Sequence, residues 1–362
     1  MLGLSSGIYG RAVLARRRLI EARPASRLRL NAPVISIGNL NVGGSGKTPF
    51  TAWLAARLAN SGYRPSILSR GYRRTAPTNA VVIVSDGSRV RADLPAAGDE
   101  PLMLARAVPA AAVLVCPERY RAGRVAEGEL GSNVHLLDDG FQHLRLDRDV
   151  DLVMLDERDL RDRPLPAGRL REPLEALRSA DAIMWTGDPA HAADVGALTG
   201  VKDVFPVRRV AGPVRTWMAG AQGTARAQAG MEGQVAGAQG SGPTTGEPVL
   251  ALAAIAHPER FFEELEDIGV DVRARMAFPD HHPYTAGDVE RIRKAAAGCG
   301  AAWVITTEKD LVRLMPFGGL PFRLAWRSLE VSPREPELFW DWLVARLRAA
   351  GGPSTARGAT IA

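Results

Sequence analysis

The sequence predicts an α/β protein whose mostly parallel sheet carries helices on both faces. Short apolar runs alternate with helical patterns over residues 31–202, which is the order of repeated strand–helix–strand units. A glycine-rich turn at residues 43–48 joins one apolar run to the next helical pattern, as in a phosphate-binding loop. The alternation resumes over residues 248–320 and predicts a second, smaller α/β unit.

The phosphate loop is the feature around which the chain is arranged. Glycines let several backbone N–H groups turn inward, and the N-terminus of the following helix adds partial positive charge, so a polyphosphate is expected. Lys47 is expected to reach the β- and γ-phosphates, and the Thr48 hydroxyl to bind Mg²⁺. The expected phosphate-binding residues are Asn41, Val42, Gly43, Gly44, Ser45, Gly46, Lys47 and Thr48.

One position departs from the strict phosphate-loop motif, because Asn41 stands where the motif has glycine. Asparagine tolerates left-handed backbone better than most residues, so we expect the departure to be mild. The alternative interpretation is an ordinary glycine-rich turn between a strand and a helix.

Two adjacent carboxylates follow the apolar run at residues 134–137. Asp138 and Asp139 resemble a Walker-B element, in which a carboxylate holds Mg²⁺ directly or through water. Which of the two binds the ion directly is left open. The alternative is a turn capped by Asp-Asp-Gly.

Two further polar clusters, considered alone, are explained by ordinary structural roles. Gly98-Asp99-Glu100-Pro101 opens a predicted helix, where acidic residues are commonly caps. Asp280-His281-His282 follows a predicted strand at residues 272–278. Three consecutive residues cannot easily ligate one metal ion, so a structural or hydrogen-bonding role is expected for them.

Composition narrows the class of protein. The net charge of +6 favours anionic partners, and only four of the 46 basic residues are lysines. Lys47 lies in the phosphate loop and Lys309 in Thr-Thr-Glu-Lys-Asp, where it is either functional or a solvated loop residue.

Cys116 and Cys299 imply no disulfide framework, which fits a reducing compartment. No apolar run is long enough to span a bilayer, and a signal-peptide core is absent at the N-terminus.

The ends of the chain and one internal stretch differ from the rest. Residues 1–30 combine apolar side chains with seven arginines and predict a basic amphipathic helix broken near Pro24. This helix either lies on an anionic membrane surface or packs on the core with an arginine-rich solvent face. Residues 219–247 read as a flexible insertion. A final helix is expected within 333–350, followed by a disordered tail at 351–362.

Several motifs in one order resemble the tetraacyldisaccharide 4′-kinases, the lipid A 4′-kinases of Gram-negative bacteria. The resemblance covers roughly residues 4–348 except the insertion, and it rests on Gly38–Pro49, Ser69-Arg70-Gly71-Tyr72, Gly98–Pro101, Leu137-Asp-Asp-Gly-Phe-Gln-His143, Pro166-Ala-Gly-Arg-Leu-Arg-Glu-Pro173, Phe278–His282 and Thr307-Glu-Lys-Asp310.

This resemblance implies a fold and an activity. The implied reaction is ATP-dependent phosphorylation of the 4′-hydroxyl of a tetraacyl glucosamine disaccharide 1-phosphate, with Mg²⁺. It implies a P-loop kinase core at 31–202, joined to the small domain at 248–320 by a two-stranded ribbon at 203–218 and 321–332. It also implies peripheral attachment to the cytoplasmic face of the inner membrane. Nucleic acid and an obligate protein partner are not expected.

The resemblance also implies roles for individual residues. Asp99 becomes the base that accepts the hydroxyl proton, oriented by His281 across the domain cleft, with Lys47 as the third catalytic residue. Glu172 would join Thr48, Asp138 and Asp139 around Mg²⁺, and Gln142 would position nucleotide or substrate. Arg70, Arg119 and Arg171 are the candidates for substrate phosphate. Pro117-Glu118-Arg119 stands where the family commonly has Asp-Arg, so the carboxylate is kept and lengthened.

Two rival functions belong to other classes. A nucleotide-switch or partitioning ATPase usually carries a second lysine just before the two glycines, and this chain has Val42 there. A kinase of another, soluble small molecule is disfavoured by the arginine-rich apolar N-terminus.

Overall fold

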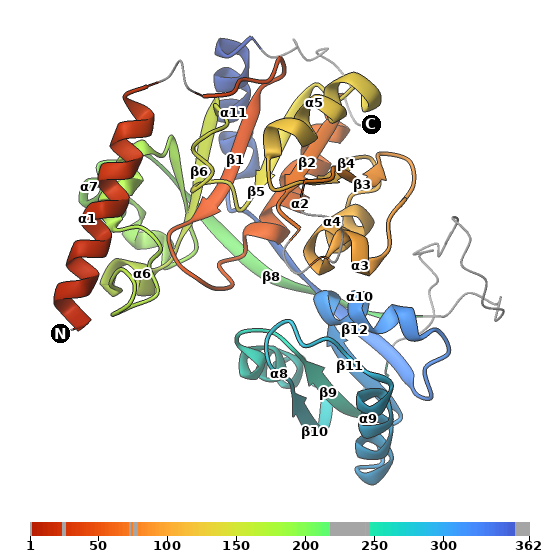
Figure 1. The fold of residues 1–362 in the computed structure, drawn as a ribbon. Coiled ribbons are helices and arrows are strands. Elements are labelled where there is room, and N and C mark those ends of the chain that lie inside the picture. Colours follow the sequence, from red (N-terminus) through yellow and green to blue (C-terminus); the bar gives the residue numbers. More distant parts are fainter. Residues whose placement is uncertain are drawn as a thin grey trace.

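The computed structural model describes residues 2–23, 27–71, 74, 79–217, 243 and 246–351. The described strands form one sheet in the order β10-β9-β11-β12-β8-β7-β6-β1-β5-β2-β4-β3. Two units of unequal size share this sheet, and the long strands β8 and β12 join them (Figure 1). The predicted α/β class with a mostly parallel sheet is confirmed.

The larger unit is built around a buried central strand. Strand β1 lies between β5 and β6 and pairs in parallel with both. Among the described strands β1 to β7, only the edge strand β3 runs antiparallel to its neighbour. Because Ile37 is in register with Asp138, the loop after β1 and the carboxyl end of β5 meet at one edge of the sheet. The strands are β1 (Val34–Asn39), β2 (Pro65–Ser69), β3 (Val82–Asp86), β4 (Ala112–Val115), β5 (Val134–Asp138), β6 (Val150–Leu155) and β7 (Ala182–Trp185).

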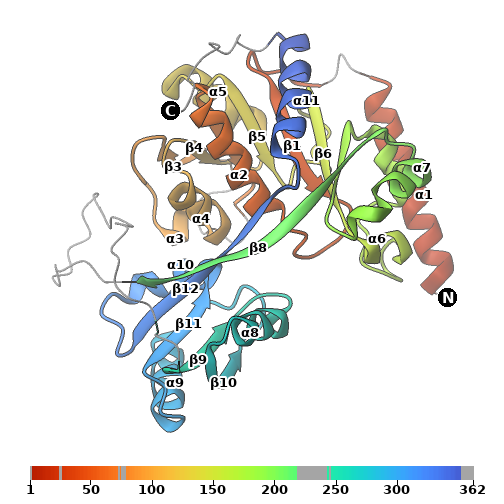
Figure 2. The ribbon, with the colours of Figure 1, turned by 180° about the vertical axis from the view of Figure 1, so that it is seen from behind.

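Helices cover both faces of this unit (Figures 1 and 2). They are α1 (Leu2–Glu21), α2 (Lys47–Asn60), α3 (Leu94–Ala97), α4 (Asp99–Ala107), α5 (Arg119–Leu130), α6 (Glu157–Arg161), α7 (Ala192–Thr199) and α11 (Pro336–Ala349), with the 3₁₀ turns η2 (Leu174–Ser179) and η3 (Pro189–His191). The C-terminal α11 returns to pack on α2, where Phe339 meets Phe50 and Trp53 with ring centroids 5.9 Å from each. The end of the chain therefore closes the core of the larger unit.

The smaller unit has its own parallel strands and core. Its elements are β9 (Pro248–Ala253), α8 (Pro258–Asp267), β10 (Asp271–Ala277), α9 (Ala286–Gly298), β11 (Trp303–Thr307), α10 (Glu308–Leu314) and η4 (Met315–Phe317). Strand β8 (Asp203–Trp217) pairs in parallel with β7 and antiparallel with β12 (Arg323–Pro333), which pairs in parallel with β11. Figure 2 shows this ribbon crossing from one unit to the other.

The ribbon strands match the residues expected for them, 203–218 and 321–332, to within two positions. The division of the whole chain into the predicted domains stays a prediction. The insertion at 219–247 and the tail at 351–362 lie outside the described residues, apart from positions 243, 246, 247 and 351. Pro24 also lies outside them, and α1 ends before it, at Glu21.

Candidate active site

The phosphate loop leads directly into α2. Gly46 is the N-cap and has φ 86°, a left-handed conformation that glycine adopts without strain. The first amides of α2, those of Lys47 and Thr48, have no acceptor within the helix because of their position. Ser45 also has a buried hydroxyl oxygen without a hydrogen-bond partner among the described residues. The loop therefore presents unused donors to an anion at the positive end of a helix.

Asn41 has a different role from the one predicted. It is absent from the residues with positive φ, so its tolerance of left-handed backbone is not used and that explanation was wrong. Its buried side chain instead accepts a hydrogen bond from the Asn39 amide at 2.7 Å and donates one to Asp159. The neighbouring Val42 N–H donates to the carbonyl of Arg169, so this end of the loop is tied to the protein. Asn41 and Val42 are thus loop supports in the described contacts.

Asp138 lies at the end of β5 and faces the start of α2. Its carboxylate accepts hydrogen bonds from Thr48 at 3.4 Å and Thr51 at 3.2 Å, and the residue is buried. Burial, followed by the charges of Glu100 and Asp139, raises the pKa of Asp138 to about 7. A buried carboxylate beside a threonine hydroxyl, without an ion pair among the described residues, suits a hard divalent cation.

Asp139 has the same residue type but the opposite environment. Its backbone is left-handed at φ 56°, and its carboxylate lies 3.3 Å from the Lys47 ammonium. Arg171 donates to both carboxylate oxygens, at 3.0 and 2.8 Å, and to Asn39 at 2.6 Å. Although burial raises the pKa of Asp139, the Lys47 charge and the Arg171 hydrogen bonds hold it well below its usual range. Of the two carboxylates, Asp138 therefore resembles a metal ligand and Asp139 a partner of cations.

No group of three or more His, Cys, Asp or Glu side chains within the described residues could alone hold a metal ion. Thr48 and Asp138 nevertheless fit Mg²⁺ as it is bound beside a nucleotide, because this ion keeps waters and takes phosphate oxygens as its remaining ligands. The donor set is therefore compatible with the predicted cofactor.

Glu172 makes contacts that its predicted role does not explain. Its buried carboxylate lies 2.7 Å from the guanidinium of Arg17 on α1, and the described contacts do not join it to Thr48 or Asp138. Arg17 also donates to the carbonyl of Phe141 at 3.0 Å and covers the ring of that residue. Metal binding by Glu172 therefore stays a prediction, whereas its pairing with α1 is observed.

Gln142 is the next-to-last residue of the Asp-Asp-Gly-Phe-Gln-His block. Its amide nitrogen donates to the carbonyl of Asn39 at 2.9 Å, and its buried amide oxygen has no partner among the described residues. The preceding turn crosses β1 so closely that a Cβ on Gly38 would lie 2.4 Å from Phe141. Gln142 therefore fastens the carboxylate turn to the phosphate-loop strand and leaves one acceptor for a ligand.

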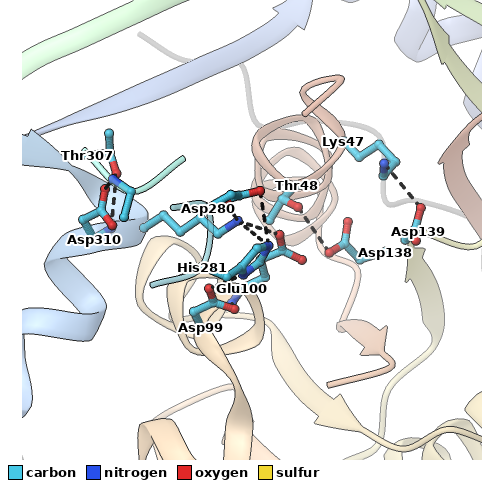
Figure 3. Close-up of polar contacts among 12 residues, drawn as sticks. Lys47, Thr48, Asp99, Glu100, Asp138, Asp139, Asp280, His281, Thr307 and Asp310 are labelled. Atoms are coloured by element: carbon cyan, nitrogen blue, oxygen red, sulfur yellow. Dashed lines mark hydrogen bonds and ion pairs between the residues drawn. The ribbon is translucent and has the colours of Figure 1, made fainter. Parts of the chain in front are cut away.

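The second half of the site joins the two units. Asp99, in the first turn of α4, accepts a hydrogen bond from His281 Nδ1 at 2.9 Å, although 182 residues separate them in sequence (Figure 3). The local reading of Asp99 as a helix cap was wrong, because Gly98 is the N-cap. Burial raises the pKa of Asp99, but the His281 hydrogen bond and the charges of Arg313 and Lys309 lower it well below its usual range. The carboxylate is therefore ionised at neutral pH.

The two halves face each other through Glu100. Lys309 lies 3.3 Å from Glu100 and 3.6 Å from Asp280, and the charge of Glu100 is one cause of the raised pKa of Asp138. Figure 3 shows the Asp99 and His281 side chains in one view with Thr48 and Asp138, around the start of α2. His282 contacts Asp288 at 3.1 Å, which fits the hydrogen-bonding role that was predicted.

Two of the predicted substrate arginines form a separate cationic cluster. Burial and then the charge of Arg70 lower the pKa of Arg119 to about 10. Burial, followed by the charge of Arg119, lowers the pKa of His143 to about 4. The buried Nε of Arg119 has no hydrogen-bond partner among the described residues. Arg70 and Arg119 therefore form a place for an anion, whereas Arg171 belongs with Asp139.

Sequence reasoning missed several residues of this region. Thr51 and Arg17 contact Asp138 and Glu172, and Arg313 contacts Asp99. Helical spacing from Thr48 could have indicated Thr51. The scarcity of lysine did single out Lys309, but nothing in the sequence separates Arg17 or Arg313 from the many other arginines.

Comparison with known proteins adds an independent observation. The family model described as tetraacyldisaccharide-1-P 4′-kinase matches residues 1–348. The chain belongs to this family. A tetraacyldisaccharide 4′-kinase of Geobacter sulfurreducens is 39% identical over 93% of this chain and 90% of its own length. The corresponding protein of Syntrophus aciditrophicus is 35% identical over 97% of this chain and 93% of its own length.

A solved structure supports the same conclusion for the fold. The crystal structure of LpxK from Aquifex aeolicus in complex with ATP has 30% sequence identity and a TM-score of 0.73, covering 94% of this chain and 97% of that one. The resemblance found in the sequence is thereby confirmed.

As a member of the tetraacyldisaccharide-1-P 4′-kinase family, the chain is an ATP-dependent lipid A 4′-kinase that uses ATP and Mg²⁺. The alternatives of a switch ATPase and of a kinase for a soluble small molecule are therefore set aside. Among the described helices, none is long and apolar enough to cross a bilayer.

Proposed function

We propose that the two halves of the site divide the phosphoryl transfer between them. The phosphate-loop half holds the donor, and Asp99 with His281 receives the acceptor hydroxyl. The observation that carries this proposal is the buried Asp99 carboxylate, which lies beside the phosphate-loop half and is held by a histidine of the other unit. The assignment of Asp99 as the base, which the family resemblance implied, is retained as a proposal on this ground.

The donor is held by groups that already converge in the structure. The β- and γ-phosphates would be bound by the Lys47 and Thr48 amides, the Lys47 ammonium and the Arg171 guanidinium. In the described structure Lys47 and Arg171 share Asp139, which keeps both cations at the loop. Thr48 and Asp138 would hold Mg²⁺, which supplies neutralising charge for the phosphate oxygens.

The transfer step follows from this arrangement. The oxygen of the 4′-hydroxyl forms a bond to the γ-phosphorus while the bond from that phosphorus to the bridging oxygen breaks, and ADP leaves with the electron pair. The hydroxyl proton passes to the Asp99 carboxylate. Because the transition state of such transfers is loose, the carboxylate first orients the hydroxyl and accepts its proton late in the step.

The acceptor carries a phosphate of its own, and Arg70 with Arg119 would bind it. Planar guanidinium groups match phosphate oxygens in pairs, and burial together with the charge of Arg70 lowers the pKa of Arg119, so an anion bound between them would be favourable. The acyl chains would lie against α1, whose outward side carries Ile8 and Leu19, each 62% exposed. This exposed apolar side supports peripheral attachment to a membrane surface, and we propose that the surface is the cytoplasmic face of the inner membrane, as the family resemblance implies.

The assay for the divided site uses purified protein in detergent with labelled ATP, Mg²⁺ and tetraacyl disaccharide 1-phosphate. Wild-type protein should produce labelled lipid, and Lys47→Ala should lower its rate roughly 10²–10³-fold, as expected for loss of one group aimed at transition-state charge. Lys294→Ala, a solvent-exposed lysine on α9, is the matched control and should not change the rate. Equal rates for Lys47→Ala and wild type would overturn the assignment of the phosphate-loop half.

The membrane assignment has a separate test on vesicles of anionic phospholipid. Ile8→Ser with Leu19→Ser removes two apolar side chains from the exposed side of α1, so binding should weaken about tenfold or more, since each is worth about 1.5–3 kcal/mol when fully buried. Leu198→Ser with Leu338→Ser, exposed residues of α7 and α11, should bind as wild type does. Equal vesicle binding by both double variants would contradict attachment through α1.

A further inference from the structure

Two cations on α10 contact the proposed Asp99–His281 pair but have no part in the transfer described above: Arg313 contacts Asp99, and Lys309 contacts His281. Lys309 and Arg313 lie one helical turn apart, so both project from the same side of the helix. Helix α10 packs against α4, which carries Asp99. The smaller unit therefore brings His281 and Arg313 to this carboxylate and Lys309 to His281.

Lys309 decides which nitrogen of His281 carries the proton. Its ammonium lies 2.9 Å from Nε2 of the ring. An ammonium has donors only, so Nε2 must offer its lone pair, and the proton of the neutral ring lies on Nδ1. Nδ1 is 2.9 Å from Asp99 Oδ2 and therefore donates to it. Arg313 also comes within 3.3 Å of Nδ1, but that nitrogen has no lone pair left, so Asp99 accepts from both.

Arg313 fixes the carboxylate itself. Its Nε donates to Asp99 Oδ2 at 3.0 Å, and Nη2 donates to the same oxygen. Its remaining nitrogen donates to the carbonyl of Ala254 at 3.1 Å and to Asp310 at 3.0 Å, so the guanidinium is held by the smaller unit. The other oxygen of Asp99, Oδ1, accepts only the Glu100 N–H at 3.0 Å among the described residues. Oδ1 is the oxygen left to meet a hydroxyl.

We propose that Lys309 and Arg313 are positioning residues of the base, Lys309 through the tautomer of His281 and Arg313 through the orientation of the Asp99 carboxylate. This inference rests on the proposed role of Asp99. Both cations come from α10, so the arrangement exists only while the two units are docked. In this proposal, Lys309 of the Thr-Glu-Lys-Asp block at the start of α10 positions His281.

The tautomer is measured directly by ¹⁵N NMR on full-length protein labelled at histidine. The chain has six histidines, and His281→Gln identifies the signal of His281. Wild type should show a single neutral tautomer with the proton on Nδ1. Lys309→Met should admit the Nε2-protonated form, whereas Lys309→Arg should restore the Nδ1 form. A wild-type ring protonated on Nε2, or a tautomer unchanged in Lys309→Met, would overturn this part of the proposal.

Arg313 is tested by the pH dependence of kcat. Among the described residues, His281, Arg313 and Lys309 act on Asp99, while Glu100 and Asp280 lie next to Lys309. Losing the Arg313 charge makes Asp99 easier to protonate, so the acid limb of the profile should move to higher pH in Arg313→Gln, with kcat at least tenfold lower. Arg313→Lys keeps the charge and should move the limb less. An unchanged profile with kcat within threefold of wild type would overturn the assignment.

A second variant controls for the possibility that Arg313→Gln does not fold. Arg313→Gln leaves the buried Asp310 without its partner, whereas Arg313→Gln with Asp310→Asn removes both charges. The double variant should fold and still show the shifted profile, and a folded double variant with the wild-type profile would contradict the proposal. The NMR result does not depend on turnover, so failure of the kinase assignment and failure of the tautomer assignment are distinguishable.

Discussion

The two halves of the active site are built in opposite ways. The phosphate-loop half uses neighbouring strands of one sheet, so Lys47, Thr48 and Asp138 are placed by the register of β1 with β5. The proposed base half takes Asp99 from one unit and His281 and Arg313 from the other. A site assembled in this way can bind a nucleotide in one half before the other half is in place. Transfer should then depend on docking of the units, whereas nucleotide binding should not.

Asp99→Asn gives the largest expected effect on this comparison. The amide keeps the size of the side chain but cannot accept the hydroxyl proton, so kcat should fall roughly 10²–10⁴-fold, the range for general base catalysis. The Kd for ATP should stay within twofold, because the nucleotide is bound by the other half. Single-turnover kinetics and ATP titration measure the two quantities, and Asp267→Asn on the exposed face of α8 is the control. A decrease in kcat of less than tenfold would contradict the assignment of Asp99 as the base.

Arg17 tests how the phosphate-loop half is supported from outside. Arg17→Met leaves Glu172 buried and unpaired, and breaking such a pair typically costs about 3–5 kcal/mol. The free energy of unfolding should drop by about 3 kcal/mol in urea titrations, while the neighbouring exposed Arg18→Met should have little effect. Arg17→Met with Glu172→Leu should recover much of the loss. If it does not, the pair is not the source of the instability.

Arg119 distinguishes the acceptor phosphate from the donor phosphates. Arg119→Gln should raise the KM for the lipid about tenfold, the loss of a charge-assisted hydrogen bond, and leave the KM for ATP unchanged. With an acceptor lacking the 1-phosphate, wild type and variant should have the same KM. A change confined to the KM for ATP would place Arg119 in the nucleotide half instead.

Substitution of Asp138 should have a smaller, pH-dependent effect on the stability of protein freed of metal by EDTA. Its pKa is raised from 3.8 to about 7, so the folded state binds more protons than the unfolded state between these values, and stability falls as pH rises. This penalty is absent below about pH 4 and complete above about pH 7. Asp138→Asn should therefore raise Tm by more at pH 8 than at pH 5.

The pH dependence of wild-type stability alone does not isolate Asp138, so it must be compared with that of the Asp138→Asn variant. Glu308 also has a pKa raised by burial to about 7, and it contributes a pH dependence of the same sign. Differential scanning fluorimetry of wild type and Asp138→Asn at the two pH values isolates the Asp138 contribution. The same gain in Tm at both values would mean that Asp138 is not the uncompensated carboxylate of this half.

The two halves also differ in how far the sequence predicted them. A phosphate loop is local, so the strand, the glycine turn and the roles of Lys47 and Thr48 followed from adjacent residues. Asp99 looked like a helix cap, and only the family resemblance joined it to His281. Its further partner Arg313 was not found, because no periodicity relates residues 214 positions apart. Arg17 was equally hidden among seven arginines, since burial and not composition makes it different.

The central claim is that Asp99 and His281 act as one unit across the two halves of the protein. A double-mutant cycle of Asp99→Asn and His281→Gln, read as single-turnover rates with saturating ATP, tests it most directly. If Asp99 and His281 act as one unit, removing either side chain already removes their joint contribution to the rate. We therefore expect the double variant to be no more than about threefold slower than the slower single variant. A double variant slowed by the product of the two single effects would contradict it and would leave the two residues acting independently.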